Sequence, residues 1–312
     1  TSLAPIFELT PGATISPASG SVQNFTTPVR YTVTSEDKAW HRVYAITARE
    51  QKASNIPTTY HFEKVRIMQN VWQEFYEEQD SGNELTWASG NKGFKWAMSE
   101  AATEDYPTTQ IDNGKTGKCV KLETRLTGDL GNMVGMPIAA GNLFIGSFDM
   151  LNAITNPLSA TRFGTPFYNK PLRLTGYYKY KAGEQFYENG EYTSRKDIFN
   201  IYAIFYDGVK YDSAGKGTDV TLDGNLPNQN YEHSSMVALA LVSNPQETEG
   251  DEWKFFDIPF DYQRYGKKID EARLTKGEYK IGIIFASSKD GATFEGAPGS
   301  TLLIDEVELI YE

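Results

Sequence analysis

The sequence predicts an all-β fold, and three of its features support this prediction. Apolar and polar residues alternate along many short runs, most clearly in residues 302–311, and a period of two is the pattern of a β-strand. Gly, Pro, Asn and Asp separate nearly all of these runs, as they do in turns between strands. Strands and long helical segments do not follow one another in regular succession, which disfavours a parallel α/β sheet.

Residues 1–56 are expected to form a small all-β module. The runs at 29–34 and 40–48 alternate, and a turn of charged and polar residues separates them. The polar stretch 51–59, which contains Pro57, interrupts the alternation. We therefore expect the boundary between two domains in this stretch.

Residues 57–312 are expected to form one larger jelly-roll β-sandwich, because many strands with long polar connections fit a double-sheet architecture. The sequence has no fixed-period repeat, which argues against a propeller or a solenoid. One helical turn is expected at residues 270–276, and alternation places Asp305 and Val307 on the same face of the last strand. The strand candidates are residues 60–65, 71–77, 94–98, 119–125, 142–149, 172–181, 197–206, 235–242, 253–260, 278–286 and 302–311.

The composition excludes several classes of function. The chain has 312 residues and a formal net charge of −11, so phosphate backbones would be repelled and a nucleic-acid partner is not expected. No apolar run approaches the roughly 18 residues of a transmembrane helix. The single cysteine, Cys119, rules out an internal disulfide, and its place in an alternating run predicts a buried thiol.

Motifs for the common catalytic centres are missing from the sequence. The three histidines, His41, His61 and His233, are far apart and form no zinc-binding pair. The sequence has no Gly-x-Ser-x-Gly turn that would present a nucleophile, and it has no glycine-rich phosphate loop. A metalloprotease, a serine hydrolase and a nucleotide enzyme are therefore disfavoured.

Sugar recognition has a different signature, which the sequence does contain. The apolar face of a sugar ring stacks on an exposed aromatic ring, while nearby polar side chains bind the hydroxyl groups. Aromatic residues make up 13% of the chain, and several adjoin polar residues, although ordinary sheet packing explains many of them. The sugar-binding candidates are Trp87, Trp96, Tyr177, Arg125, Tyr202 and Tyr206.

Tyr177 is the best placed of three tyrosines in its expected strand. Alternation puts Tyr178 and Tyr180 on the opposite face of this strand. Tyr177 shares its face with Arg173 and Lys179, so this is the more polar side of the strand. Trp87 falls in a loop-like stretch, which favours exposure. Trp96 falls in an expected strand.

Glycoside hydrolysis is a second possibility, and it needs two carboxylates at a defined separation. The chain has 41 acidic residues, so composition alone does not identify a pair. The acids expected on strands, and hence candidates for catalysis, are Glu123, Asp207 and Glu306.

Several segments resemble the putative carbohydrate metabolism domain family. They are GKCVKLETR from residue 117, GMPIAAGNLFIGSF from 135, TRFGTPF from 161, KPLRLTGYYKYKAGE from 170 and IFASSKDGATFEGAPGSTLLIDEVEL from 284. The resemblance implies a jelly-roll sandwich and an exported, lipid-anchored protein of the cell surface or outer membrane, or of the periplasm, with a role in polysaccharide use. Residues 15–48 also resemble the immunoglobulin-like modules of surface lipoproteins in Gram-negative gut bacteria. The family supplies no catalytic residues to carry over.

Jelly-roll sugar-binding modules often hold a structural calcium ion, and a calcium site of that kind is a further hypothesis for this chain. The counterparts of its ligands here would be Glu63, after Phe62, and Asp305 in the final strand. No other cofactor is expected.

Three functions remain open at this point. The favoured one is a surface protein that binds a polysaccharide or oligosaccharide for a degradation system. The alternatives are a glycoside hydrolase on the same scaffold and an adhesive or structural surface protein. A binding protein predicts an exposed aromatic row, a hydrolase predicts a carboxylate pair in a deeper cleft, and an adhesin predicts an apolar outer patch.

Overall fold

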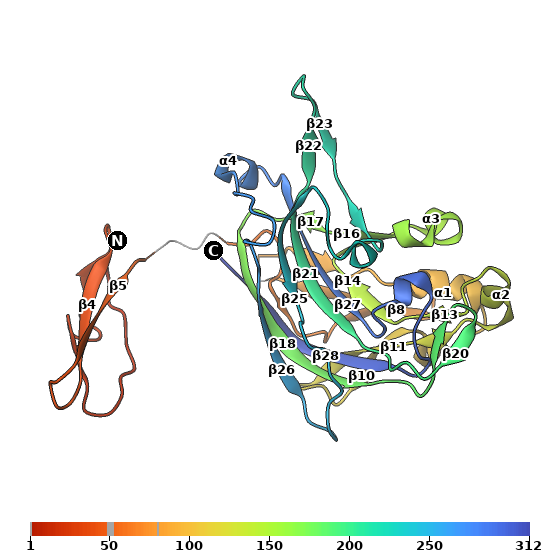
Figure 1. The fold of residues 1–312 in the computed structure, drawn as a ribbon, viewed down its shortest axis with the longest axis horizontal. Helices are drawn as coiled ribbons and strands as arrows, with labels where there is room; N and C mark the ends of the chain where they lie inside the picture. Colours follow the sequence, from red (N-terminus) through yellow and green to blue (C-terminus); the bar gives the residue numbers. More distant parts are fainter. Residues whose placement is uncertain (1, 49–52, 80) are drawn as a thin grey trace. The chain divides into compact units, whose positions relative to one another are not determined.

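The computed structural model describes residues 2–48, 53–79 and 81–312, and the chain divides into two compact units between Ala53 and Ser54. Strands make up most of the regular structure in both units, which confirms the expected all-β class (Figure 1). Within the described ranges, no helix combines the length and the apolar character that a membrane span requires.

The first unit is built from short antiparallel strands. One sheet has the order β2-β4-β5, and β1 pairs with β3. Tyr31 is buried and packs its ring 4.7 Å from that of Phe7, while Phe25 is buried as well. The strands are β1 (Ser2–Leu3), β2 (Thr14–Ser16), β3 (Gln23–Asn24), β4 (Val29–Thr34) and β5 (His41–Ile46). An immunoglobulin-like module stays a prediction for this unit.

The second unit is a β-sandwich. Its first layer, here called the β18 sheet, has the antiparallel order β10-β11-β28-β18-β26, with β6 beside β28. Its second layer, the β21 sheet, has the order β14-β27-β21-β25, with β17 beside β27. The β18 sheet comprises β6 (Thr59–Tyr60), β10 (Thr108–Asp112), β11 (Lys118–Glu123), β18 (Pro171–Lys181), β26 (Lys254–Pro259) and β28 (Thr301–Tyr311). The β21 sheet comprises β14 (Asn142–Phe144), β17 (Thr165–Pro166), β21 (Asn200–Asp207), β25 (Met236–Leu241) and β27 (Tyr279–Ala286).

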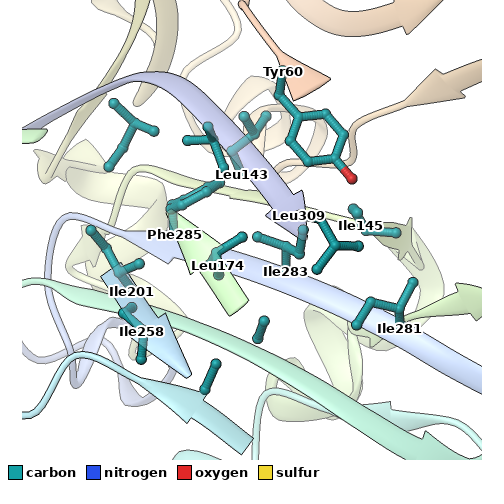
Figure 2. Close-up of a cluster of buried hydrophobic side chains, with 14 of the residues drawn as sticks. Tyr60, Leu143, Ile145, Leu174, Ile201, Ile258, Ile281, Ile283, Phe285 and Leu309 are labelled. Atoms are coloured by element: carbon teal, nitrogen blue, oxygen red, sulfur yellow. The ribbon is translucent and has the colours of Figure 1, made fainter. Parts of the chain in front are cut away.

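The main core lies between the two sheets. Figure 2 shows Leu174 and Leu309 from the β18 sheet meeting Ile201 and Ile283 from the β21 sheet. These four side chains are at most 1% exposed. Burial of apolar surface of this kind is the main favourable term in folding.

The β21 sheet is covered on both faces, unlike a sheet with one face in water. Ile201 of β21 faces the main core, whereas Tyr202 and Tyr206 of the same strand belong to a second buried cluster with Phe163 and Ile284. Almost every residue of β21 is therefore buried.

A β-bulge interrupts the alternation of β28. The register with β18 shifts between Thr175 and Tyr177, and Glu306 adopts a φ of 48°. Consequently Ile304 and Val307 both face the core, although they lie three positions apart. The expectation that Asp305 and Val307 share a face is therefore wrong.

Short elements cover the ends and the outer side of the β21 sheet. Helix α1 contacts both α2 and α3, and Figure 1 shows the three helices grouped on one side of the unit. The expected helical turn near residue 273 is confirmed by α4. The helices are α1 (Asn91–Ala97), α2 (Gly128–Met133), α3 (Met150–Thr155) and α4 (Glu271–Leu274), and the 3₁₀ turns are η1 (Thr103–Asp105), η2 (Pro157–Ser159), η3 (Pro227–Gln229) and η4 (Gly291–Thr293). The remaining strands are β7 (Val65–Met68), β8 (Trp72–Glu78), β9 (Glu84–Thr86), β12 (Arg125–Leu126), β13 (Ile138–Ala139), β15 (Gly146–Phe148), β16 (Thr161–Phe163), β19 (Phe186–Glu188), β20 (Glu191–Thr193), β22 (Val209–Tyr211), β23 (Gly217–Asp219) and β24 (Leu222–Asp223).

Candidate functional site

The outer face of the β18 sheet carries a group of aromatic side chains, here called the aromatic patch: Tyr177, Trp253 and Phe255. Tyr177 lies directly opposite Phe255 on the neighbouring strand, and their ring centroids are 5.2 Å apart. The Phe255 side chain is 54% exposed, which is unusual for so large an apolar group. The patch therefore offers an aromatic surface to solvent.

Lysines and ion pairs border the aromatic patch. The Lys115 ammonium lies 4.9 Å from the centre of the Tyr177 ring, and that of Lys179 lies 5.1 Å from the Trp253 ring. Lys179 also pairs with Asp251 at 3.2 Å. Arg173 and Asp257 form an ion pair of 2.6 Å on the strands that carry Tyr177 and Phe255. Hydrogen-bonding groups thus adjoin the exposed rings.

Two carboxylates hold the loop that carries Lys115. Thr116 donates its backbone N–H to Asp305 Oδ2 at 3.0 Å, and Lys118 donates its own to Glu63 Oε1 at 2.7 Å. The bulge in β28 directs Asp305 toward this loop, which buries the side chain completely. Burial raises the pKa of Asp305 to about 6.

Glu63 and Asp305 do not fit the implied calcium site. Backbone N–H groups already point at Asp305 Oδ2 and Glu63 Oε1, and Glu306 donates its N–H to Asp305 Oδ1 at 2.8 Å. The positive ends of these dipoles favour a carboxylate and repel a cation. Within the described part of the chain, no three His, Cys, Asp or Glu side chains gather in a way that would hold a metal ion.

The two expected tryptophan platforms lie elsewhere. Trp87 is 1% exposed, and its ring packs 5.0 Å from Tyr60 and 5.9 Å from Phe285 in the main core, so it has no free face for a sugar. Trp96 is 37% exposed, but it lies on helix α1 and not on the expected strand. Neither residue adjoins the aromatic patch.

Tyr202 and Tyr206 are also unsuited to sugar contact. Both are at most 2% exposed because short strands and loops cover the outer side of the β21 sheet. The Tyr206 hydroxyl donates to the carbonyl oxygen of Phe163 at 2.7 Å. These residues therefore pack and anchor the covering strand.

Cys119 is fully buried as expected, and burial raises its pKa to about 12.

Glu123 and Arg125 do come together, in a groove beside helix α1. Arg125 Nε lies 3.0 Å from Glu123 Oε1, and Lys121 Nζ lies 3.1 Å from Glu123 Oε2. Asp105 and Glu100, which the sequence did not single out, line the same groove, and Asp105 lies 3.9 Å from Arg125. Each oxygen of Glu123 is therefore already engaged with a cation.

The other two candidate acids have separate partners. Asp207 accepts two hydrogen bonds from Arg273, at 2.6 and 2.9 Å, near helix α4. Glu306 Oε2 lies 2.9 Å from His61 Nδ1. Among the described interactions, none joins Glu123, Asp207 or Glu306 to another of the three.

Alternation placed Lys179 on the face of Tyr177, but Trp253, Phe255 and Lys115 were not recognised as parts of the same surface. Trp253 and Phe255 alternate with Phe256, which faces the core, so the run WKFFDIP contained a usable signal. The position of Lys115 had no such signal, because it depends on a loop held by residues distant in the sequence.

The fold is that of a two-unit protein whose second unit is a large β-sandwich with an aromatic patch on one outer face. The family model described as "Putative carbohydrate metabolism domain" matches residues 61–310, and the one described as "SGBP, N-terminal" matches residues 1–48. The chain therefore belongs to the putative carbohydrate metabolism domain family.

Two solved structures are similar over most of the chain. One is a putative glycoside hydrolase from Bacteroides vulgatus ATCC 8482, with 49% identity and a TM-score of 0.77, covering 83% of this chain and 100% of the other. The second is a putative glycoside hydrolase from Bacteroides thetaiotaomicron VPI-5482, with 46% identity and a TM-score of 0.74, covering 100% of this chain and 87% of the other. A search among curated proteins found no match.

Proposed function

We propose that this protein binds a glycan at the aromatic patch. The observation that carries the proposal is the contact between the exposed Phe255 and the half-buried Tyr177 on the outer face of the β18 sheet, with Trp253 beside them. An aromatic ring of this kind stacks on the C–H face of a sugar and removes apolar surface from water. Lys179, Asp251 and the other bordering charged groups then bind hydroxyl or acidic groups.

The family and the N-terminal match support a place for the protein in polysaccharide use at the cell surface. We further propose that it is exported and lipid-anchored at the outer membrane, and that the first unit is an immunoglobulin-like spacer. Labelling of intact cells with an antibody against the second unit tests this location. Signal that appears only after permeabilisation contradicts it.

Glycan-loaded gels test the binding site. Wild-type protein should be retarded by at least one polysaccharide of a broad panel. Phe255→Ala and Tyr177→Ala should each reduce retardation severalfold, because each removes an aromatic contact worth about 1 kcal/mol or more. Tyr192→Ala is the matched control, since Tyr192 is 52% exposed but lies on the separate β19–β20 hairpin. Equal retardation of all four proteins places the binding site elsewhere.

A glycoside hydrolase is the second candidate, and the groove that contains Glu123, Asp105 and Glu100 favours it. In this case substrate must displace Lys121 or Arg125 from Glu123 before the carboxylate can act. Release of reducing ends over a day detects the activity. If Glu123 is catalytic, Glu123→Gln abolishes release and leaves retardation intact. Release that persists in this variant removes Glu123 from the mechanism.

A further inference from the structure

The chain contains two steps in which a glycine follows an asparagine, Asn113–Gly114 and Asn189–Gly190. The backbone nitrogen at such a step can attack the asparagine side chain, because glycine has no side chain of its own to hinder the approach. Reactions of this kind make asparagine one of the heat-sensitive residues of proteins. The motif is the same at both steps, so any difference in reactivity comes from the fold.

Deamidation at an asparagine–glycine step needs water as its only co-reactant. The glycine nitrogen attacks the asparagine Cγ, a new C–N bond forms, and the bond from Cγ to the side-chain amide nitrogen breaks. That nitrogen takes up the proton of the glycine N–H and leaves as ammonia, and a cyclic imide remains. Water then adds to either ring carbonyl and opens the ring to aspartate or isoaspartate. The glycine N–H must therefore be free to move toward the side chain.

The Asn113–Gly114 step is held in place. Gly114 donates its N–H to the carbonyl oxygen of Gly117 at 2.9 Å. A Cβ added to Gly114 would lie 2.6 Å from the carbonyl oxygen of Lys118 and 2.7 Å from Asp305 Oδ2, so this glycine has close neighbours. The two carboxylates described above fix the same loop. Attack by Gly114 therefore requires loss of a hydrogen bond and rearrangement of a packed loop.

The Asn189–Gly190 step is open. It forms the tip of the β19–β20 hairpin, between Glu188 and Glu191, and its two residues have φ values of 52° and 89°. Both residues are exposed, and no atom beyond the chain neighbours lies within 4 Å of a Cβ added to Gly190. Among the described backbone groups, none accepts a hydrogen bond from the Gly190 N–H. No protecting contact of the kind seen at Gly114 is thus described here.

The strands of this hairpin are anchored although its tip is open. Tyr187 exchanges two backbone hydrogen bonds with Gly296, at 2.9 and 3.1 Å, and Phe186 is buried. The rings of Tyr187 and Tyr192 pack 5.4 Å apart across the two strands. These contacts fix the strands, whereas none of those described fixes the turn between them.

We propose that Asn189 is a site of spontaneous deamidation in the folded protein and that the fold protects Asn113 from the same reaction. Conversion of Asn189 adds a negative charge beside Glu188 and Glu191, and isoaspartate also lengthens the backbone of a two-residue turn. The turn sets the register of the hairpin, so the pairing of β19 with β20 should weaken in the product. The proposal is independent of glycan binding at the aromatic patch.

Ageing of the full chain in mildly alkaline buffer, followed by tryptic digestion and mass spectrometry, tests the proposal. Cleavage after Lys and Arg places the two asparagines in separate peptides, residues 96–115 and 182–195. We expect peptide 182–195 to deamidate at least about fivefold faster than peptide 96–115, because reaction at Asn113 must first break a backbone hydrogen bond. Equal rates, or faster conversion at Asn113, overturn the proposal.

The same chain unfolded in urea is the control for sequence effects, because unfolding removes the hydrogen bond of Gly114 and leaves the sequence unchanged. The two peptides should then convert at similar rates. A difference that is as large in urea as in the folded protein overturns the protective role of the fold.

Gly117→Ala tests the protection within the folded protein. Gly117 has a φ of 59° and supplies the carbonyl oxygen that accepts from Gly114, so an added side chain disturbs this contact. The variant should deamidate severalfold faster at Asn113 and at an unchanged rate at Asn189. Gly215→Ala, in the β22–β23 hairpin, is the matched control and should change neither rate.

Discussion

Trp87 is the largest fully buried side chain of the second unit, and its role is structural. Its ring fills the space between Tyr60, Phe62 and Phe285. Trp87→Ala should lower the free energy of unfolding by about 3–5 kcal/mol, because it removes a large buried ring and leaves a cavity. Urea denaturation of the second unit measures this loss. A variant of unchanged stability that no longer binds glycan would contradict the structural role.

The pH dependence of stability should carry a contribution from Asp305. Burial raises its pKa from 3.8 to about 6, so between these values the folded protein binds more protons than the unfolded chain. The stability that Asp305 contributes therefore falls as pH rises from about 4 to above 6, by up to about 3 kcal/mol. The free energy of unfolding of the wild type, minus that of Asp305→Asn, should decrease across this range.

Asp305→Asn is a suitable comparison because it lacks the titration and retains one acceptor oxygen. It loses an acceptor for either Thr116 or Glu306 at every pH, which is a constant cost. Denaturant titrations at several pH values between 4 and 7.5 separate the two effects. A stability difference that grows with pH would mean that Asp305 is ionised more readily in the folded state than the buried geometry implies.

Alternation predicted side-chain direction well where a strand has one open face. It placed Tyr178 and Tyr180 opposite Tyr177, and the structure buries these two and leaves Tyr177 half-buried on the outer face. It failed for Tyr202 and Tyr206, because both faces of β21 are covered. A pattern of two faces does not show which of them meets water, so burial in such a sheet depends on distant segments.

At the scale of elements, the loop at residues 113–117 depends on Gly117. This residue has a φ of 59°, and a Cβ added there would lie 2.1 Å from Glu63 Oε1. Gly117→Ala should therefore expel Glu63 from its hydrogen bond with Lys118 and lower the free energy of unfolding by about 2–3 kcal/mol. It should also displace Lys115 from Tyr177, which amide chemical shifts of the loop would report.

Gly215→Ala is the control for this substitution. Gly215 has a φ of 78° in the β22–β23 hairpin, but no atom lies within 4 Å of its added Cβ. It should show only the backbone cost, about 1 kcal/mol. Equal losses in the two variants would mean that the collision with Glu63 contributes nothing.

The long strands were predicted from the sequence better than the short helices were. Long alternating runs became β18, β21, β27 and β28, since a regular period leaves little ambiguity over eight residues or more. Residues 94–98 were expected as a strand and lie in helix α1 or at its end, because a short and mostly apolar run fits either structure. Helices α2 and α3 are also short, and the alternation of the sequence did not predict them. The candidate site was only partly foreseeable, because alternation placed Tyr177 and Lys179 on one face whereas Lys115 lies on a loop that residues distant in the sequence hold.

At the scale of the molecule, the two units have separate cores. The buried clusters of the described second unit begin at Ile56 and include nothing from the first unit. Tyr31→Ala removes a side chain that is 1% exposed and should lower the free energy of unfolding of the first unit by about 3–5 kcal/mol. A unit this small usually has less stability than that to lose. Calorimetry should show the first unit unfolded and the transition of the second unit unchanged. A single transition shifted as a whole would contradict independent cores.

The place of β28 in its sheet sets the order in which the second unit can be completed. β28 lies between β11 and β18, yet it follows them by more than a hundred residues in the chain. Until the ribosome has made residues 301–311, β11 and β18 lack their shared partner and expose the edges that it will occupy. The sandwich therefore closes only after residues 301–311 have been made, so the second unit folds as a whole and not strand by strand along the nascent chain.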